Sequence, residues 1–140
     1  MKMENVESPA LLRGVRILIV EDELLVADYL GELLGMEGCI VLGPALRVHE
    51  ALALIERERP EAAILDLNLR GERTTVVAEA LMARRVPCVV VTGYGAEHVP
   101  DDPVLQQAPR LGKPFRSRQL LRALADTVVG FEHSRNSSFR

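Results

Sequence analysis

The chain has 140 residues, of which 48% are hydrophobic and 26% charged, with a formal net charge of −3 at pH 7. This length predicts one domain. The acidic balance offers no electrostatic case for nucleic acid or an anionic membrane, because such binding needs basic clustering, so we expect neither partner. No stretch approaches the roughly 18 apolar residues of a membrane span, and no basic leader precedes an apolar run at the N-terminus, so we expect a cytoplasmic protein.

Short apolar runs rich in β-branched residues alternate with longer segments of helical period, which is typical of a doubly wound α/β protein with a parallel sheet. We expect five strands, at residues 16–20, 39–42, 62–65, 88–91 and 110–111. We expect five helices, at residues 24–34, 48–58, 74–84, within 93–108 and at 117–128. The fourth helix is predicted to be short or irregular, because Pro100 and Pro103 lack the N–H that a helix interior needs. These elements predict a domain at residues 14–129 between two tails, 1–13 and 130–140.

Ionisable or hydroxyl side chains follow four of the five predicted strands. They are Glu21, Asp22 and Glu23 after the first strand, Asp66 after the third, Thr92 after the fourth and Lys113 after the fifth. Each of them alone is explained equally well as a helix cap or a solvated loop residue. In an open parallel sheet, however, ligands bind outside the carboxyl ends of the strands. The joint pattern therefore predicts a crevice where acids, a hydroxyl and a lysine converge.

Four segments carry these side chains, in the order Ile17–Glu23, Ile64–Asn68, Val89–Gly93 and Gly112–Phe115. They read Ile-Leu-Ile-Val-Glu-Asp-Glu, Ile-Leu-Asp-Leu-Asn, Val-Val-Val-Thr-Gly and Gly-Lys-Pro-Phe. Together they resemble the receiver (phosphoacceptor) domain of bacterial two-component response regulators, over residues 14–128. The resemblance implies a flavodoxin-like sheet of strand order 2-1-3-4-5 and a signalling protein rather than an enzyme. It also implies a stand-alone receiver, with no output domain in this chain.

By this resemblance Asp66 accepts a phosphoryl group from a histidine kinase or a histidine phosphotransfer protein. Mg²⁺ suits such a site, because it takes one or two carboxylates and completes its octahedron with waters and phosphate oxygens. The resemblance implies Asp22 and Asp66 as direct Mg²⁺ ligands. It implies Glu21 as a ligand through water and the backbone carbonyl of Asn68 as a further ligand. Glu23 is expected to cap the first helix instead, where its charge complements the helix dipole.

The phosphoryl group would lie against Lys113, as a point charge, and against the hydroxyl of Thr92. The resemblance also makes the bond between Lys113 and Pro114 a candidate cis peptide, which would aim the lysine into the crevice. Phosphorylation adds about −1.5 to −2 units of charge, enough to draw Thr92 inward and bias a two-state equilibrium. We expect the face of the fourth helix, fifth strand and fifth helix to respond and to control a downstream protein partner, in a monomer or weak dimer.

Two positions depart from the family pattern. Most receivers carry Tyr or Phe three residues before the lysine as a rotating switch, and here that residue is Arg110. Tyr94 instead follows Thr92 in a Thr-Gly-Tyr sequence that resembles a subgroup of stand-alone receivers. We predict that Tyr94 takes the switch role, the alternative being a half-exposed loop aromatic. Arg70 stands where receivers often have proline, which would alter the rigidity of the loop after Asp66.

Other functions remain open beside that of a switch. A phosphate sink or relay intermediate would pass the phosphoryl group on without a state-dependent effector. A pseudo-receiver would be held in one state. The presence of a chemically suitable residue at every position of the crevice argues against that alternative. A hydrolase of the haloacid-phosphatase type would place a second acid two residues after its nucleophile, where this chain has Asn68.

Overall fold

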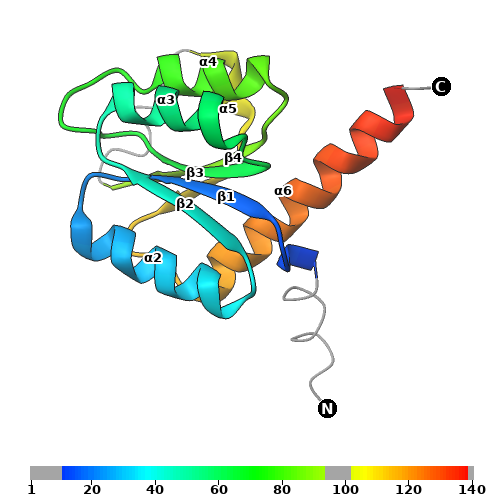
Figure 1. Ribbon diagram of the computed structural model, residues 1–140, viewed down its shortest axis with the longest axis horizontal. Helices are drawn as coiled ribbons and strands as arrows, with labels where there is room; N and C mark the ends of the chain where they lie inside the picture. The colour runs from blue at the N-terminus through cyan, green and yellow to red at the C-terminus, as the bar shows by residue number, and fades with distance from the viewer. Residues whose placement is uncertain (1–10, 94–101, 139–140) are drawn as a thin grey trace.

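The computed structural model describes residues 11–93 and 102–138 and contains the five-stranded parallel sheet that the sequence predicts, in the order β2-β1-β3-β4-β5 (Figure 1). The strands are β1 Arg16–Val20, β2 Ile40–Ala45, β3 Ala62–Asp66, β4 Cys88–Thr92 and β5 Arg110–Gly112. The helices are α2 Leu24–Met36, α3 Val48–Glu58, α4 Thr75–Ala83, α5 Pro103–Gln107 and α6 Ser117–Ser138. In the described part of the chain, no helix is both long and apolar enough to cross a membrane.

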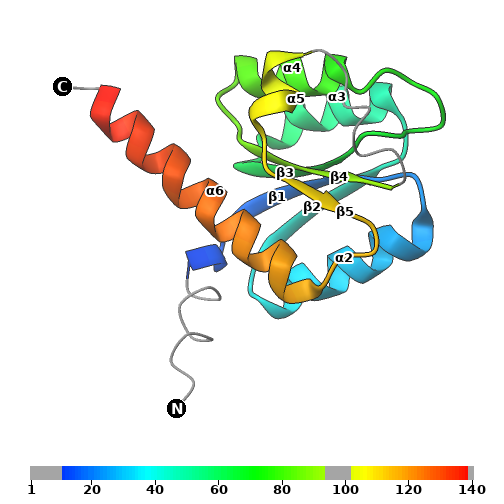
Figure 2. The ribbon, with the colours of Figure 1, turned by 180° about the vertical axis from the view of Figure 1, so that it is seen from behind.

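The helices cover both faces of the sheet. Helices α3, α4 and α5 lie on one face and α2 and α6 on the other, as both ribbon views show (Figures 1 and 2). The three central strands are buried on both faces, which explains their almost continuous apolar sequences. Successive side chains of each strand enter opposite cores: Leu18 and Val20 pack towards α3 and α4, whereas Ile17 and Ile19 pack towards α2 and α6.

Strand β2 is longer than the prediction, which ended it before Gly43 and Pro44. The strand runs through both residues to Ala45, and its register against β1 shifts between Leu18 and Val20. A proline is tolerated there because β2 is an edge strand, so its missing N–H costs no ladder hydrogen bond. Gly43 is required by its positive φ of 89° and because a Cβ would lie 2.9 Å from the carbonyl oxygen of Ile19.

Packed or helical structure extends beyond both predicted bounds of the domain, residues 14 and 129. Leu12 is fully buried among the side chains that α2 and α6 contribute to the core, so residues 11–13 belong to the packed domain. Helix α6 continues to Ser138 and makes residues 130–138 helical, and no proline interrupts them. In Figure 1 the second half of α6 projects beyond the sheet.

The predicted short fourth helix is α5, with only five residues. Pro103 occupies its first turn, where a missing N–H is harmless. The carboxylate of Asp102 caps the helix by accepting from the N–H groups of Val104 and Leu105, at 2.9 and 3.2 Å. This helix leads directly into β5, the edge strand beside β4.

Candidate functional site

The strand register brings the ends of β1, β3, β4 and β5 together at one edge of the sheet. Val20 pairs with Leu65, Asp66 with Val91, and Thr92 with Gly112. The residues that follow or end these strands therefore share one crevice, as the sequence predicts. Carboxylate oxygens of Glu21, Asp22 and Asp66 all lie within 4.8 Å of one another there.

Lys113 is the counter-charge of this acidic cluster. Its Nζ lies 3.1 Å from Asp66 Oδ2, 3.0 Å from Glu23 Oε1 and 3.1 Å from Glu21 Oε1. Burial alone would lower the pKa of Lys113, but its hydrogen bond to Glu23 and the charges of Asp66 and Glu21 hold that pKa above its usual value. The lysine is therefore a fixed positive charge at all ordinary pH values.

The backbone fixes where the lysine points. Its own N–H donates to the carbonyl of Thr92 at 2.7 Å, which continues the β4–β5 ladder into the crevice. The peptide bond between Lys113 and Pro114 is cis in the structure. Glu23, expected to cap α2, forms no side-chain cap hydrogen bond within the described residues and contacts the lysine instead.

Glu21 is the most deeply buried of the acids, with 1% of its side chain exposed. One oxygen, Oε2, accepts from the N–H of Glu23 at 3.0 Å and from Lys113 Nζ at 3.3 Å. The other, Oε1, lies 3.1 Å from the same Nζ as an ion pair but accepts no hydrogen bond from any described residue. Burial, reinforced by the neighbouring charge of Asp66, raises the pKa of Glu21 to about 7. A buried carboxylate oxygen without a hydrogen bond is available to a metal or to a metal-bound water.

We expect Glu21→Gln to stabilise the metal-free protein by about 1–3 kcal/mol near pH 8 and to give no gain near pH 5. A carboxyl whose pKa rises from 4.5 to about 7 on folding binds its proton more tightly in the folded state. The wild type therefore gains stability as the pH falls through 7 towards 4.5, and the amide variant loses that dependence. Urea unfolding in EDTA checks this, with Glu79→Gln on the exposed face of α4 as control; equal stabilities of Glu21→Gln and wild type at both pH values would contradict it.

Both oxygens of Asp66 are held. Oδ1 accepts from the N–H of Asn68 at 3.0 Å, and Oδ2 accepts from Lys113 at 3.1 Å. The hydrogen bond from Asn68 folds the start of the β3–α4 loop back onto the strand end, a local turn typical of aspartate. Thr74 ties the other end of the loop down, because its buried hydroxyl donates to the carbonyl of Leu67 at 3.3 Å.

A cavity of about 880 Å³ opens over these groups. Its polar lining consists of Asp22, Glu23, Asp66, Asn68, Arg70, Thr92 and Lys113. Its apolar lining consists of Leu25, Val26, Tyr29, Pro114 and Phe115, with Gly93 beside them. The cavity thus exposes the acidic cluster to solvent and has an apolar side that α2 and the loop after β5 form.

The residues fit Mg²⁺ as a group. Mg²⁺ binds hard oxygen ligands, takes one or two carboxylates and keeps several waters. Glu21, Asp22 and Asp66 offer carboxylate oxygens close enough to share one ion, and Oε1 of Glu21 accepts no hydrogen bond from the described residues, although the ammonium of Lys113 lies 3.1 Å away. The open cavity leaves room for water and for phosphoryl oxygens.

One contact of the site was missed by the sequence analysis. The guanidinium of Arg70 pairs with Asp22, with Nε 3.3 Å from Oδ2. The sequence showed only an arginine at a position where proline is common, and no spacing rule links it to Asp22. Tyr94, predicted as a switch residue, lies outside the described residues, and Arg110 is an exposed residue of the edge strand β5.

A doubly wound sheet whose strand ends carry an acidic cluster and a facing lysine defines a flavodoxin-like domain whose crevice fits a divalent metal. Residues 17–125 match the family model of the response regulator receiver domain. The chain therefore belongs to that family, the phosphoacceptor domains of two-component signalling, which are not classical enzymes.

Relatives and solved structures agree with this membership. The solution structure of SdrG from Sphingomonas melonis Fr1 is 41% identical with a TM-score of 0.72, and the match covers 83% of this chain and 97% of that one. The transcriptional regulatory protein PdtaR of Mycobacterium tuberculosis is 31% identical over 83% of this chain and 58% of its own length. The positive alginate biosynthesis regulatory protein of Pseudomonas aeruginosa is 35% identical over 79% and 46%. The chain thus spans about half the length of these curated relatives.

A further solved structure concerns the metal. The receiver domain of the sensor histidine kinase PA1611 from Pseudomonas aeruginosa has a magnesium ion coordinated in its active-site cleft. It is 26% identical with a TM-score of 0.70, and the match covers 82% of this chain and 98% of that one. The acidic cluster of this chain lies at the carboxyl ends of its strands.

Proposed function

We propose that this chain is a phosphoryl-accepting switch of a two-component phosphorelay, with Asp66 as the acceptor. The observation that carries the proposal is the position of this carboxylate. It is buried at the end of β3, faces the open cavity and lies 3.1 Å from a fixed positive charge on Lys113. Transfer to a carboxylate is opposed by charge repulsion, so positioning and charge neutralisation are what the protein must supply.

In the proposed reaction a carboxylate oxygen of Asp66 attacks the phosphorus atom of a phosphohistidine. The new O–P bond forms as the N–P bond breaks, and the electron pair of that bond stays on the imidazole nitrogen, which takes up a proton. Lys113 offsets the charge of the phosphoryl oxygens, and the hydroxyl of Thr92 donates to them once transfer is complete.

Mg²⁺ would be held by Asp22 and Asp66 directly, by Glu21 through water and by the backbone carbonyl of Asn68. When bound, it supplies positive charge to the phosphoryl oxygens and a template for their orientation. Glu21 is buried and its pKa is raised to about 7 in the metal-free protein, so it suits a role behind a metal-bound water better than one as a fully charged direct ligand.

The phosphodonor has to reach Asp66 through the cavity, and this requirement indicates where it docks. Leu25 and Tyr29 line the cavity from α2 and are 85% and 42% exposed, and Phe115 lines it from the β5–α6 loop. Exposed apolar side chains beside a site are typical of a protein-binding surface. We propose that a histidine kinase or phosphotransfer protein, acting in the cytoplasm, covers these side chains while its histidine enters the cavity.

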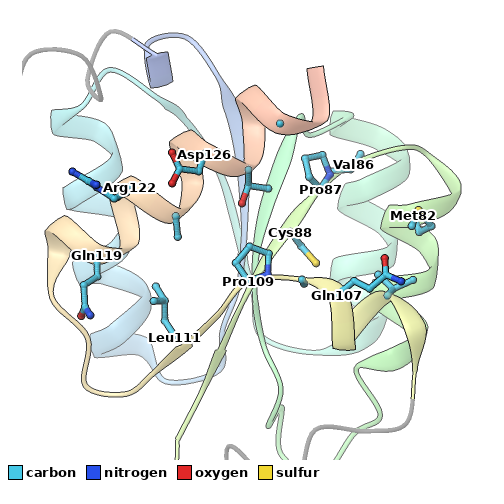
Figure 3. Close-up of a pocket in the computed structure, with 15 residues that line it drawn as sticks. Met82, Val86, Pro87, Cys88, Gln107, Pro109, Leu111, Gln119, Arg122 and Asp126 are labelled. Carbon is cyan, nitrogen blue, oxygen red and sulfur yellow. The ribbon is translucent and has the colours of Figure 1, made fainter. Parts of the chain in front are cut away.

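The surface that reports the phosphorylated state is proposed to be the face of α5, β5 and α6. Thr92 ends β4, and its carbonyl accepts a hydrogen bond from the backbone N–H of Lys113 after β5. A movement at Thr92 therefore reaches the edge strand directly. A second cavity of about 730 Å³ lies on this face. Figure 3 shows Gln119, Arg122 and Asp126 of α6 on one side of it, Met82 and Gln107 on the other, and Cys88 and Pro109 between them. This hollow is where a downstream protein partner would bind.

Incubation with acetyl phosphate and Mg²⁺ tests the proposal. Intact mass spectrometry is expected to show one added phosphoryl group on the wild type and none on Asp66→Asn. Asp28→Asn, on an exposed position of α2, removes the same charge and is expected to react as the wild type does. An unmodified wild type, or a modified Asp66→Asn, would contradict Asp66 as the acceptor.

The same phosphorylated sample separates a switch from a phosphate sink. A switch is expected to shift the amide resonances of Leu111 and Gln119 in heteronuclear NMR spectra, because both residues lie on the proposed output face. A sink needs no such change. If only resonances beside Asp66 move, the phosphoryl group is stored or relayed and the output surface is wrong.

A further inference from the structure

Arg70 lies at the mouth of the proposed phosphorylation site, on a loop that contacts hold in place. Its φ of 54° is in the left-handed region, which is unfavourable for a residue with a Cβ, and Gly71 follows with a φ of 79°. A bridge between Leu69 and Glu72 closes the turn, and Leu69 is fully buried beneath it. The turn therefore presents the arginine side chain outwards from a fixed base.

Glu72 anchors this turn to a different part of the fold. Its Oε1 accepts from the N–H of Val48 at 2.8 Å, and its Oε2 pairs with the guanidinium of Arg47 at 3.1 Å. The first of these contacts satisfies one backbone N–H at the N-terminus of α3, whose N-cap residue makes no side-chain cap hydrogen bond with the described residues. The loop is thus pinned by α3 on one side and by buried Leu69 on the other.

The side chain of Arg70 is directed into the site although it is 67% exposed. Its Nε lies 3.3 Å from Asp22 Oδ2, and it lines the same cavity as Asp66, Thr92 and Lys113. An exposed ion pair stabilises a fold only slightly. The ion pair therefore adds little to the stability of the fold, and the position of the guanidinium in the cavity that Asp66 and Lys113 also line favours a role in the chemistry of the site.

We propose that Arg70 is a state-dependent counter-cation: it pairs with Asp22 in the unmodified protein, where it weakens Mg²⁺ binding, and it moves to the phosphoryl oxygens once Asp66 is modified. The proposal rests on the proposed function of Asp66. The oxygens of Asp22 and Asp66 lie within 4.8 Å of one another, a distance that an arginine side chain spans by rotation. A phosphoryl group offers three acceptor oxygens and about two negative charges, and the planar guanidinium binds such a group with two parallel hydrogen bonds.

The two halves of this role predict opposite effects of one substitution. Without Arg70, Asp22 has lost its cationic neighbour, so Mg²⁺ alone is expected to bind Arg70→Gln about 2- to 5-fold more tightly than the wild type. The phosphoryl group has lost a ligand, so beryllofluoride, a phosphoryl mimic, is expected to bind at least about 3-fold more weakly at saturating Mg²⁺. Tighter metal binding alone would favour beryllofluoride, so a merely structural arginine does not produce this pair of changes.

Isothermal titration calorimetry with Mg²⁺, and then with beryllofluoride in saturating Mg²⁺, measures both affinities on the full chain. Arg73→Gln is the matched control, because Arg73 is exposed in the same loop and forms no ion pair with any described residue. Circular dichroism spectra that match the wild type show that both variants fold. Unchanged Mg²⁺ affinity, unchanged beryllofluoride affinity, or equal effects of Arg73→Gln would each overturn the role of Arg70.

Failure of this inference is distinguishable from failure of the proposed function. If beryllofluoride binds the wild type but not Asp66→Asn, the acceptor site stands whatever Arg70 does. If it binds neither, the proposed function itself fails, and the role of Arg70 fails with it.

Discussion

Replacement of Lys113 by methionine is expected to slow phosphorylation by acetyl phosphate at least about 100-fold and to lower the free energy of unfolding by about 2–3 kcal/mol near pH 8. Methionine keeps the apolar stem and removes the ammonium that contacts Glu21, Glu23 and Asp66. Two of these carboxylates are buried, so they are left uncompensated. Breaking a buried pair by removing one partner costs about 3–5 kcal/mol, which is reduced here because the lysine is partly exposed.

The loss of stability in Lys113→Met should shrink as the pH falls from 8 to 5, because Glu21 can then take up a proton. Urea unfolding in EDTA at both pH values measures the loss, and phosphorylation rates come from intact mass. Arg116→Met removes an exposed cation three residues further along and serves as the control. If Lys113→Met is as stable as Arg116→Met near pH 8, the lysine does not neutralise the cluster.

The sequence predicted those residues of the site whose positions the ends of the strands determine. β3 and β4 are continuous apolar runs buried on both faces, so the residues that end them, Asp66 and Thr92, are readable from the sequence alone. The alternation of parallel strands and helices then brings those ends to one edge, whatever the loops do. The acids and the lysine were found for the same reason.

The parts that the sequence did not predict depend on loops and on local tolerance. The predicted strand ends at residue 42, before Gly43 and Pro44, because both residues usually interrupt strands, but the edge strand β2 tolerates them. Arg70 meets Asp22 only because a left-handed turn, anchored to α3 by Glu72, points it back across the site. Such a contact depends on three segments at once, and hydrophobic periodicity carries no information about it.

The sequence also did not predict which of the three acids after β1 contact Lys113. Adjacency in the sequence suggested that Glu23 belongs to the helix, because it occupies the N-cap position of α2. In the fold its carboxylate reaches Lys113 instead, and only Glu21 and Asp22 join Asp66 in one oxygen cluster. Glu23 therefore shares the counter-charge of the site without contributing an oxygen to the cluster.

Asp22→Asn is expected to lower the affinity for Mg²⁺ at least about 10-fold and to remove Mg²⁺-dependent phosphorylation. In EDTA its free energy of unfolding should equal that of the wild type or exceed it by up to about 1 kcal/mol. Asp22 adds negative charge beside two other carboxylates, and its ionic partner in the described part of the chain is the exposed Arg70. Repulsion among these acids destabilises the metal-free protein and is relieved by a cation, so the feature that weakens the fold is what binds the metal.

Calorimetric Mg²⁺ titrations and urea unfolding in EDTA test both halves on the same samples. Glu23→Gln removes one charge at a contact of Lys113 without removing an oxygen of the cluster, so its Mg²⁺ affinity should change less than about 3-fold. Equal losses of affinity in the two variants would mean that Asp22 acts through charge alone. An Asp22→Asn variant that unfolds more easily while binding Mg²⁺ normally would mean that this carboxylate is structural, and the metal would then have to be held by Glu21 and Asp66.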